Sequence, residues 1–237
     1  MLDQFTDHTP VWTADRLIER LRLSRPTGYR YMRELVGAGL LSRIGAGLYS
    51  LGPRIIELDY LMRRTDPMLV ASRSVISELV ADTGCTVMLA GLYGDHLVTT
   101  HQESGIEALN LTYGRGTSMP IARGAGSKII IAQFSRPRLT RLYEADPKSF
   151  KVAKLGTSLD TVRASLGAIR KAGFAITYGE LDSGYVGIAS PVFNRDRDVL
   201  GSVIAALSAA RLKIIDLDRL CARVRAAGDA ITASVAT

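Results

Sequence analysis

Apolar residues recur with helical spacing twice near the start of the chain. In "ADRLIERLRL", Leu17 and Leu21 fall on one helical face, and the preceding Thr13 has a side chain suited to an N-cap. Ser24 is placed to cap a second helix, because Pro26 then falls in the first turn, where a missing N–H breaks no hydrogen bond. The pattern predicts two short helices joined by a turn of about three residues, a helix-turn-helix.

Two short apolar runs follow in "LLSRIGAGLYSLG", and Gly45 and Gly47 between them are typical of a tight turn. A hairpin directly after a helix-turn-helix makes a winged helix, which we expect over residues 1–52. Helical spacing returns in "PRIIELDYLMRR", so a linker helix is expected over residues 53–65.

Residues 66–237 mix helical and strand patterns. Helices are expected around 67–83 and 122–134, in "SLDTVRASLGAIRKAG" up to Gly173, and from about 216 onward. Strands are expected as a hairpin in "CTVMLAGLYGDHLVTTHQE", around 109–113, and in "FAITYGEL", "VGIASPVFN" and "VLGSVIAALSA". Strand runs flanked by helices at both ends indicate an α+β fold with a mostly antiparallel sheet, in a chain of two domains.

The positive charge is concentrated near the start of the chain. The formal net charge is +7, and between residues 16 and 43 seven arginines stand against two glutamates. No lysine precedes Lys128, so the positive charge of the first half is entirely guanidinium, which suits bidentate contacts to phosphate or guanine. This distribution indicates an anionic partner, although an arginine-rich codon bias explains it about as well.

The second predicted helix has two different faces. Gly28, Tyr31, Met32 and Leu35 have the spacing of a face that turns toward a core. The other face combines basic, aromatic and hydroxyl side chains: Arg25, Thr27, Tyr29, Arg30 and Arg33. Solvated helices usually mix both charges, so this face favours a recognition helix that enters the major groove of DNA. A solvated or protein-contacting face is the alternative.

We make predictions for two further residues of this region. Arg43 flanks the turn of the hairpin, and we expect it to contact DNA beside an otherwise uncharged wing tip. Gly28 lies on the core face although glycine weakens a helix by about 1 kcal/mol relative to alanine. We therefore expect the preceding helix to pack unusually close to Gly28.

The residue types that perform enzyme chemistry are scattered. The segment "RGAGSK" lacks the ending of a phosphate-binding loop, and no G-x-S-x-G motif is present. Cys85 and Cys221 lie far apart and outside any Cys/His group, so we expect core residues and neither a disulfide nor a metal site. No cofactor is expected. Without an apolar run of membrane length or a signal peptide, we expect a cytoplasmic chain with no membrane partner.

Four stretches make a family resemblance: "LRLSRPTGYRYMRELVGAGLLSRIGAGLYSLGPRIIEL", "TGCTVMLAGLYGDHLV", "MPIARGAGSKIIIA" and "IRKAGFAITYGELDSGYVGIASPVFNRDRDVLGSVIAALS". They resemble the IclR family of bacterial transcriptional regulators over nearly the whole chain, and the last stretch is the most specific. The resemblance implies a homodimer or tetramer that binds palindromic double-stranded operator DNA. It also implies that residues 66–237 form a GAF-like domain for effector binding and oligomerisation. We expect the family's first helix to be short or missing here: either the start of the chain is truncated, or "LDQF" is all that remains of that helix.

The resemblance also implies an effector pocket. In members that bind small 2-oxo acids, the pocket has an acidic residue, a cysteine, two serines and the backbone amides of a glycine-rich helix start. The matching positions here are Thr177 for the acid, Gly187 for the cysteine, and Ile204 and Ala206 for the serines. The backbone amides match Ala125 and Gly126.

The exchange of polar for apolar side chains changes the expected effector. An apolar wall penalises a small hydroxylated acid and accepts an aromatic ring or alkyl chain. We therefore expect an aromatic or similarly apolar carboxylate whose anion meets the amides near Gly124 to Gly126. Three residues, Tyr178, Glu180 and Tyr185, are each expected either at the pocket rim or on the outer surface of the strand.

Together these features predict a metabolite-responsive, DNA-binding transcriptional regulator of a catabolic operon, and not an enzyme. The sequence does not distinguish repression from activation. Two alternatives stay open: an enzyme built on a GAF-like domain, and a winged-helix module that contacts another protein through its arginine and tyrosine face.

Overall fold

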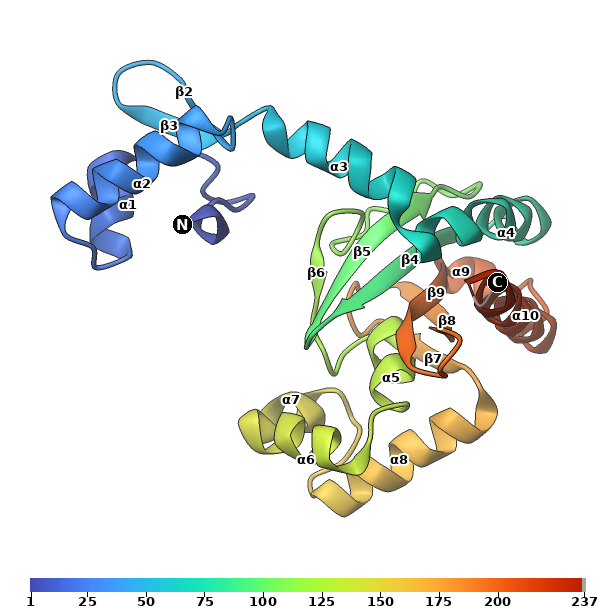
Figure 1. The fold of residues 1–237 in the computed structure, drawn as a ribbon. Helices are drawn as coiled ribbons and strands as arrows, with labels where there is room; N and C mark the ends of the chain where they lie inside the picture. Colours follow the sequence, from blue (N-terminus) through green and yellow to red (C-terminus); the bar gives the residue numbers. More distant parts are fainter. Residues whose placement is uncertain (236–237) are drawn as a thin grey trace. The chain divides into compact units, whose positions relative to one another are not determined.

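The computed structural model describes residues 1–235 and divides into two compact units, which meet in sequence between Asp66 and Pro67 (Figure 1). The first unit combines short helices with a three-stranded sheet, and the second has a six-stranded antiparallel sheet. The α+β fold class with an N-terminal winged helix-turn-helix is therefore confirmed.

The first unit begins with a short 3-10 helix, Leu2–Gln4. Its other elements are β1 (Trp12–Thr13), α1 (Ala14–Arg20), α2 (Arg25–Gly37), β2 (Leu41–Arg43), β3 (Leu48–Leu51) and α3 (Arg54–Thr65). The sheet has the order β1-β3-β2, and both of its pairs are antiparallel. Strand β1 was not expected, because a two-residue strand is too short to show alternation.

Both predicted N-caps of this unit are confirmed. The Thr13 hydroxyl oxygen accepts a hydrogen bond from the Arg16 N–H at 3.3 Å, and Ser24 accepts one from the Thr27 N–H at 3.4 Å. These bonds satisfy N–H groups that have no partner within the helix. Because the caps fix where both helices begin, they also fix the turn between them.

The core of the first unit is small. Its buried cluster consists of Ala14, Leu17, Met32 and Leu41, with Leu35 and Trp12 partly buried against it, and Ile18 is buried as well. The expectation that Tyr31 faces this core is wrong, since 44% of that residue is exposed. Helix α1 is short and packs against the side of α2 that presents Gly28 and Met32, so Tyr31 lies beyond the edge of the buried stripe.

The side chain of Ile18 on α1 lies directly against Gly28 of α2. A Cβ atom at this position would lie 2.2 Å from Cγ1 of Ile18 and 2.6 Å from its Cδ1. Real Cβ atoms do not approach other atoms this closely, so a larger residue here requires the Ile18 side chain to shift. The expectation of close packing by the preceding helix is confirmed.

The second unit is built on a sheet with the strand order β6-β5-β4-β9-β8-β7. Its strands are β4 (Thr86–Tyr93), β5 (His96–Glu103), β6 (Ser118–Met119), β7 (Ala175–Tyr178), β8 (Tyr185–Phe193) and β9 (Val199–Ser208). Its helices are α4 (Pro67–Thr83), α5 (Ala125–Ile131), α6 (Arg136–Ala145), α7 (Pro147–Val152), α8 (Leu159–Ala172), α9 (Ala209–Leu212) and α10 (Leu217–Val235).

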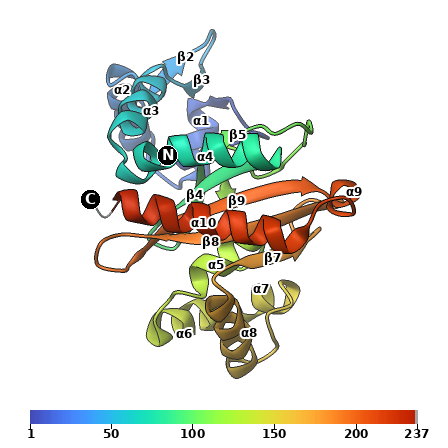
Figure 2. The same cartoon turned by 90° about the vertical axis from the view of Figure 1, so that its right-hand side faces the viewer.

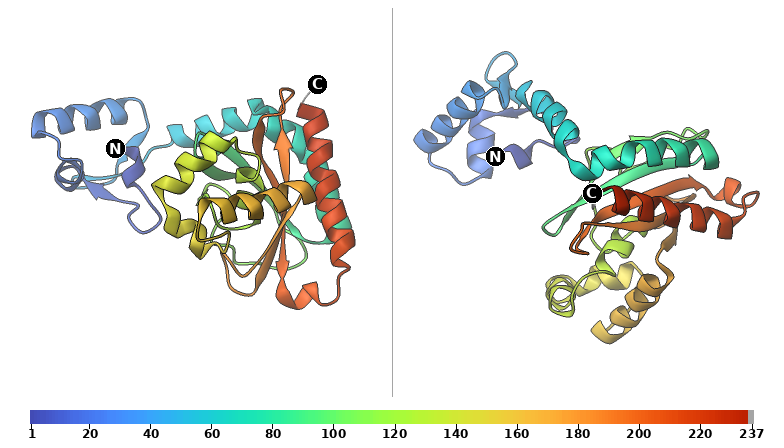
Figure 3. Two further views of the ribbon diagram at one scale, coloured as in Figure 1. Left: turned by 90° about the horizontal axis from the view of Figure 1, so that it is seen from below. Right: turned by 45° about the vertical axis from the view of Figure 1, so that its right-hand side comes forward.

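Helices cover both faces of this sheet. Helices α4 and α10 run side by side over one face (Figure 2), and α5 packs on the opposite face with α6, α7 and α8 beyond it (Figure 3). Alternate residues of β4 serve the two layers: Val87 and Leu89 join the core under α4 and α10, whereas Met88 and Ala90 join the core under α5. The sheet is thus the shared wall of two separate apolar cores.

The capping residues at both ends of α8 allowed its bounds to be predicted from the sequence. The Ser158 hydroxyl oxygen accepts a hydrogen bond from the Thr161 N–H at 3.3 Å, and Gly173 ends the helix in the left-handed conformation at φ 77°. Helices α6 and α7 were not predicted, because their sequences are polar and their apolar stripes are narrow.

The strand expected around 109–113 is absent from the described structure, and its prediction is wrong. The segment does alternate, with Leu109 and Leu111 facing inward. However, its backbone N–H groups bond to side chains instead of a neighbouring strand: Asn110 to the Tyr185 hydroxyl at 3.3 Å, and Thr112 to the Asp182 carboxylate at 3.2 Å. The alternation of apolar and polar residues here therefore reflects which side chains are buried, and it does not indicate pairing with a neighbouring strand.

Within residues 1–235, no helix has both the length and the apolar character required to cross a membrane.

The contact at Gly28 generates a stability test with a matched control. Gly28→Ala should destabilise the first unit, because Ile18 must move, even though alanine is the better helix former. Gly37→Ala in the same helix meets no atom within 4 Å and should leave stability unchanged or raise it by up to about 1 kcal/mol. Trp12 is the only tryptophan of the chain, so its fluorescence during urea unfolding reports on this unit. A Gly28→Ala protein as stable as Gly37→Ala would contradict the close-packing account.

Candidate nucleic-acid interface and ligand cavity

The predicted DNA-contacting residues of the first unit lie outside its core. Arg25, Arg30 and Arg33 are exposed along α2, Arg43 is exposed on β2, and Tyr29 is 42% exposed. Thr27 is only half-buried, and its hydroxyl oxygen accepts a hydrogen bond from the Ser24 hydroxyl at 2.9 Å. Thr27 therefore contributes to the helix cap as well as to the surface.

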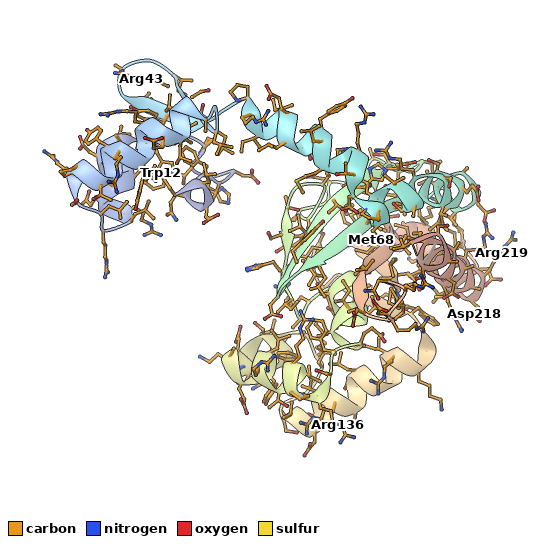
Figure 4. All side chains as sticks on the ribbon, viewed as in Figure 1. Trp12, Arg43, Met68, Arg136, Asp218 and Arg219 are labelled. Atoms are coloured by element: carbon orange, nitrogen blue, oxygen red, sulfur yellow. The ribbon has the colours of Figure 1, made fainter. Side chains whose placement is uncertain are left out.

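Helix α2 and the hairpin share one surface hollow. Tyr29 and Arg33 lie one helical turn apart on α2, and both line the hollow together with Arg43 and Tyr49. Antiparallel pairing of β2 with β3 sets Arg43 directly opposite Tyr49. The structure thus brings Tyr29, Arg33 and Arg43 together, and Figure 4 shows Arg43 on the hairpin. Arg30 does not line this hollow.

An acidic residue of α1 contacts this face. The Asp15 carboxylate accepts a hydrogen bond from the Tyr29 hydroxyl at 3.3 Å and lies 3.8 Å from the Arg25 guanidinium. The negative charge of Asp15 raises the pKa of Tyr29, so the phenol stays protonated and can donate. All three side chains are exposed, so these contacts orient the groups and add little to stability.

Tyr31 is a surface residue that the sequence pattern assigned to the core. The Arg30 guanidinium lies 5.5 Å from the centre of the Tyr31 ring, within the range of a cation–π contact. Tyr31 therefore adds a second exposed aromatic ring to the basic face of α2. The sequence pattern placed Tyr31 on the core face because it follows Gly28 by three residues. The pattern does not show that α1 is too short to cover Tyr31.

A cavity of about 50 Å³ lies in the second unit between α5 and the sheet. Six of the eight predicted effector residues line it: Ala125, Gly126, Thr177, Gly187, Ile204 and Ala206. Gly124 and Tyr178 do not, and Tyr178 is 59% exposed. The other wall residues are Met88, Leu111, Tyr113, Met119, Glu180, Leu181, Asp182, Tyr185 and Val186.

Strand register explains why the six residues converge. Thr177 pairs with Gly187 across β7 and β8, and Gly187 pairs with Ala206 across β8 and β9. Paired residues share a face, and Ile204 lies on the same face two residues before Ala206. Helix α5 covers this face so closely that a Cβ atom on Gly126 would lie 2.4 Å from Cδ1 of Ile204. The wall is therefore apolar at both positions for which the family resemblance implied serines.

The start of α5 is held by a carboxylate of the same chain. The Gly124 N–H donates to Oε2 of Glu180 at 3.1 Å, and the Lys128 ammonium donates to the other carboxylate oxygen. Lys128 also donates to the Ala153 carbonyl at 2.8 Å, and only 7% of its side chain is exposed. Glu180 therefore engages the first of the amides at which we expected an effector anion, and this leaves the amides of Ala125 and Gly126 as the candidates.

Sequence patterns missed most of the apolar wall. Leu111 and Tyr113 come from the irregular region after β5, Met119 comes from the two-residue strand β6, and Leu181 comes from the loop between β7 and β8. No local periodicity marks a residue that covers a cavity from a loop.

The cysteines are free and buried, as expected for core residues, and burial raises the pKa of both Cys85 and Cys221. Across residues 1–235, no group of three or more His, Cys, Asp or Glu side chains is arranged to hold a metal ion.

The family model and the similar proteins that match this chain all point to the same family. The model of the family "Bacterial transcriptional regulator IclR C-terminal" matches residues 63–233. The chain is similar to the HTH-type transcriptional regulator KipR of Bacillus subtilis, with 24% identity over 222 residues that cover 92% of this chain and 87% of KipR.

Solved structures agree with this result. A putative IclR transcriptional regulator from Silicibacter sp. superposes with a TM-score of 0.81 at 26% identity, covering 99% of this chain and 92% of its own. An IclR homologue from Microbacterium hydrocarbonoxydans, complexed with 4-hydroxybenzoate, has a TM-score of 0.77 at 18% identity and shares the fold over 99% of this chain and 95% of its own.

Proposed function

The chain belongs to the IclR family of bacterial transcriptional regulators, and we propose that its α2 face reads operator DNA while the cavity under α5 binds a regulatory metabolite. The protein is a DNA-binding transcriptional regulator and not an enzyme. The observation on which the residue assignment depends is the cluster of exposed basic and aromatic side chains from Arg25 to Arg33 on α2, a helix directly followed by the hairpin.

In this proposal, α2 enters the major groove with its N-terminal half. Arg25, Tyr29 and Arg30 then lie near base edges or neighbouring phosphates, since recognition helices contact bases mainly through their first turns. Arg33 and Arg43, which line one hollow together with Tyr29, lie near the sugar-phosphate backbone. Thr27 contacts DNA only where its capping hydrogen bond with Ser24 leaves its oxygen accessible.

Single arginine substitutions test the DNA face. Arg30→Ala and Arg33→Ala should each weaken binding to a duplex from upstream of the protein's own gene, measured by gel shift at several salt concentrations. A lost phosphate contact lowers the salt slope by about 1, and a lost base contact costs about 1–3 kcal/mol and relaxes specificity.

Arg195→Ala is the matched control, because it removes the same charge from an exposed position between β8 and β9. It should leave DNA affinity and salt slope unchanged. Wild-type affinity in both α2 variants would contradict the assignment of α2 and favour a protein-contacting face.

For the effector, we propose an aromatic or similarly apolar carboxylate. Met88, Met119 and Ile204 offer the ring an apolar wall, and the amides of Ala125 and Gly126 are the nearest backbone donors for its anion. The cavity as it stands has room for a few water molecules, so a ring requires the covering loops to move outward. The 4-hydroxybenzoate complex of the Microbacterium homologue supports this chemical class.

Calorimetry with benzoates and small oxo acids tests the effector class. Benzoates should bind at least about tenfold more tightly than pyruvate or glyoxylate, because the apolar wall gives the small acids little contact area. The double variant Ile204→Ser and Ala206→Ser should lose this preference, since it introduces hydroxyls at both positions. Tight binding of pyruvate or glyoxylate without any benzoate binding would contradict the proposal.

We further propose a homodimer, or a tetramer built from it, in which α3 of one chain meets α3 of a second copy. Helix α3 has no buried residue, although it contains Ile55, Ile56, Leu58, Tyr60, Leu61 and Met62. A 12-residue helix is marginal in water without packing, so an apolar surface of this size indicates a partner. Two copies also fit a palindromic operator.

Sedimentation of the full chain tests this interface. Wild-type protein should sediment as a dimer or tetramer at micromolar concentration, and Ile56→Glu with Leu61→Glu should weaken that association. Ile214→Glu in the second unit is the control, since Ile214 is 85% exposed and should tolerate the change. A monomeric wild type, or a double variant with unchanged assembly, would contradict the proposed interface.

A further inference from the structure

A surface hollow of about 260 Å³ lies at one end of the second unit, where α4 ends and α9 and α10 begin. The cavity under α5 is smaller, at about 50 Å³, and no described residue lines both. Helices α4 and α10 cover the opposite face of the sheet from α5 (Figure 2). The walls of the hollow are Asp82, Thr83, Arg211, Ile215, Asp216, Arg219, Leu220 and Arg223.

Three guanidinium groups line this hollow. Arg219 and Arg223 lie one helical turn apart on α10, and Arg211 comes from α9. Figure 4 shows Arg219 on α10. Two like charges at this spacing destabilise a helix, and a third positive charge in the same hollow adds to the repulsion. The cluster therefore requires negative charge to offset it.

The carboxylates of the hollow meet this requirement only in part. Asp82 accepts a hydrogen bond from the Nε–H of Arg223, which leaves the terminal NH2 groups of that side chain available. Asp216 accepts a hydrogen bond from the backbone N–H of Arg219 at 3.0 Å and so caps α10. Within residues 1–235, the guanidinium of Arg219 itself has neither a hydrogen bond nor an ion pair.

Arg211 gives the hollow a fixed positive charge. Its guanidinium donates to the carbonyls of Thr83 and Gly84 at the end of α4 and lies 4.0 Å from the Glu107 carboxylate. Only 14% of its side chain is exposed. A guanidinium held in this way loses little conformational freedom when an anion binds beside it.

A phosphate group fits this arrangement better than a carboxylate. Guanidinium groups form bidentate hydrogen bonds with both anions. One guanidinium satisfies the two oxygens of a planar carboxylate, whereas the three free oxygens of a phosphate monoester point in different directions and accept from several donors. Three guanidinium groups from two helices therefore match a tetrahedral anion. The half-buried Ile215 adds an apolar surface for a short carbon skeleton.

We propose that this hollow is a further ligand site that binds a phosphate group, either free or as the monoester of a small metabolite. Arg219 and the terminal NH2 groups of Arg223 donate to the phosphate oxygens, and Arg211 adds its charge from a fixed position. The site uses no residue of the proposed DNA face or of the effector cavity, so it goes beyond the function proposed above.

Calorimetry on the full chain, at constant ionic strength, tests this site with inorganic phosphate, glycerol 3-phosphate and succinate. At least one of the two phosphates should bind with a Kd of about 1 mM or below, and succinate should bind at least about tenfold more weakly. Arg219→Gln should weaken phosphate binding about tenfold, because it removes charge-assisted hydrogen bonds. Arg211 is left unchanged, since its bonds at the end of α4 also stabilise the fold.

Arg225→Gln is the matched control, because it removes the same charge from an exposed position of α10 outside the hollow. It should leave phosphate affinity unchanged. Without ligand, both variants should melt near the wild-type temperature, because both replaced side chains are exposed. Phosphate should then raise the melting temperature of the wild type and of Arg225→Gln more than that of Arg219→Gln.

The two phosphates distinguish the source of the ligand. Tighter binding of glycerol 3-phosphate supports a phosphorylated metabolite, and tighter or equal binding of inorganic phosphate supports the free ion. Several results would overturn the proposal: no binding of either phosphate, equal affinity for succinate, unchanged affinity in Arg219→Gln, or an equal loss in Arg225→Gln. These outcomes are independent of whether the DNA and effector assignments hold.

Discussion

The buried ion pair between Lys128 and Glu180 determines the form of the ligand cavity. It joins the first turns of α5 to the loop between β7 and β8, and the same carboxylate holds the Gly124 N–H. Both charges are largely removed from water, so each requires the other, and loss of one partner of such a pair typically costs about 3–5 kcal/mol. With α5 fixed in this way, the amides of Ala125 and Gly126 keep a constant position over the sheet, and the wall side chains decide which molecule fits.

The first unit depends on a steric constraint instead of a charge. The Ile18 side chain occupies the space that a Cβ atom at position 28 would need, so α2 packs closely against α1 along the side that carries Gly28. Met32 lies on this side and is buried, whereas Arg30 and Tyr31 are exposed. The side of α2 with the basic and aromatic groups is therefore the one that does not pack against α1.

Sequence reasoning succeeded where the deciding signal is local. Caps such as Thr13 and Ser24 act within a few residues of themselves, so the sequence located α1 and α2 correctly. It failed where the outcome depends on distant partners: Tyr31 is exposed because α1 is short, and residues 109–113 form no strand because Tyr185 and Asp182 take their N–H groups. For the cavity, the prediction from the sequence was partly correct. The family resemblance identified six wall residues, but Gly124 and Tyr178 do not line the cavity.

The hydrogen bonds at Asn110 and Thr112 have a kinetic consequence. They connect the irregular segment after β5 to Tyr185 and Asp182, and the residues of both regions cover the cavity. Because these bonds join backbone to side chain and belong to no ladder, separating the two regions breaks a few exposed contacts and leaves the sheet intact. For the proposed effector, exchange would then require only brief local opening, so its residence time would follow how often these regions part, and its association would be slower than diffusion alone permits.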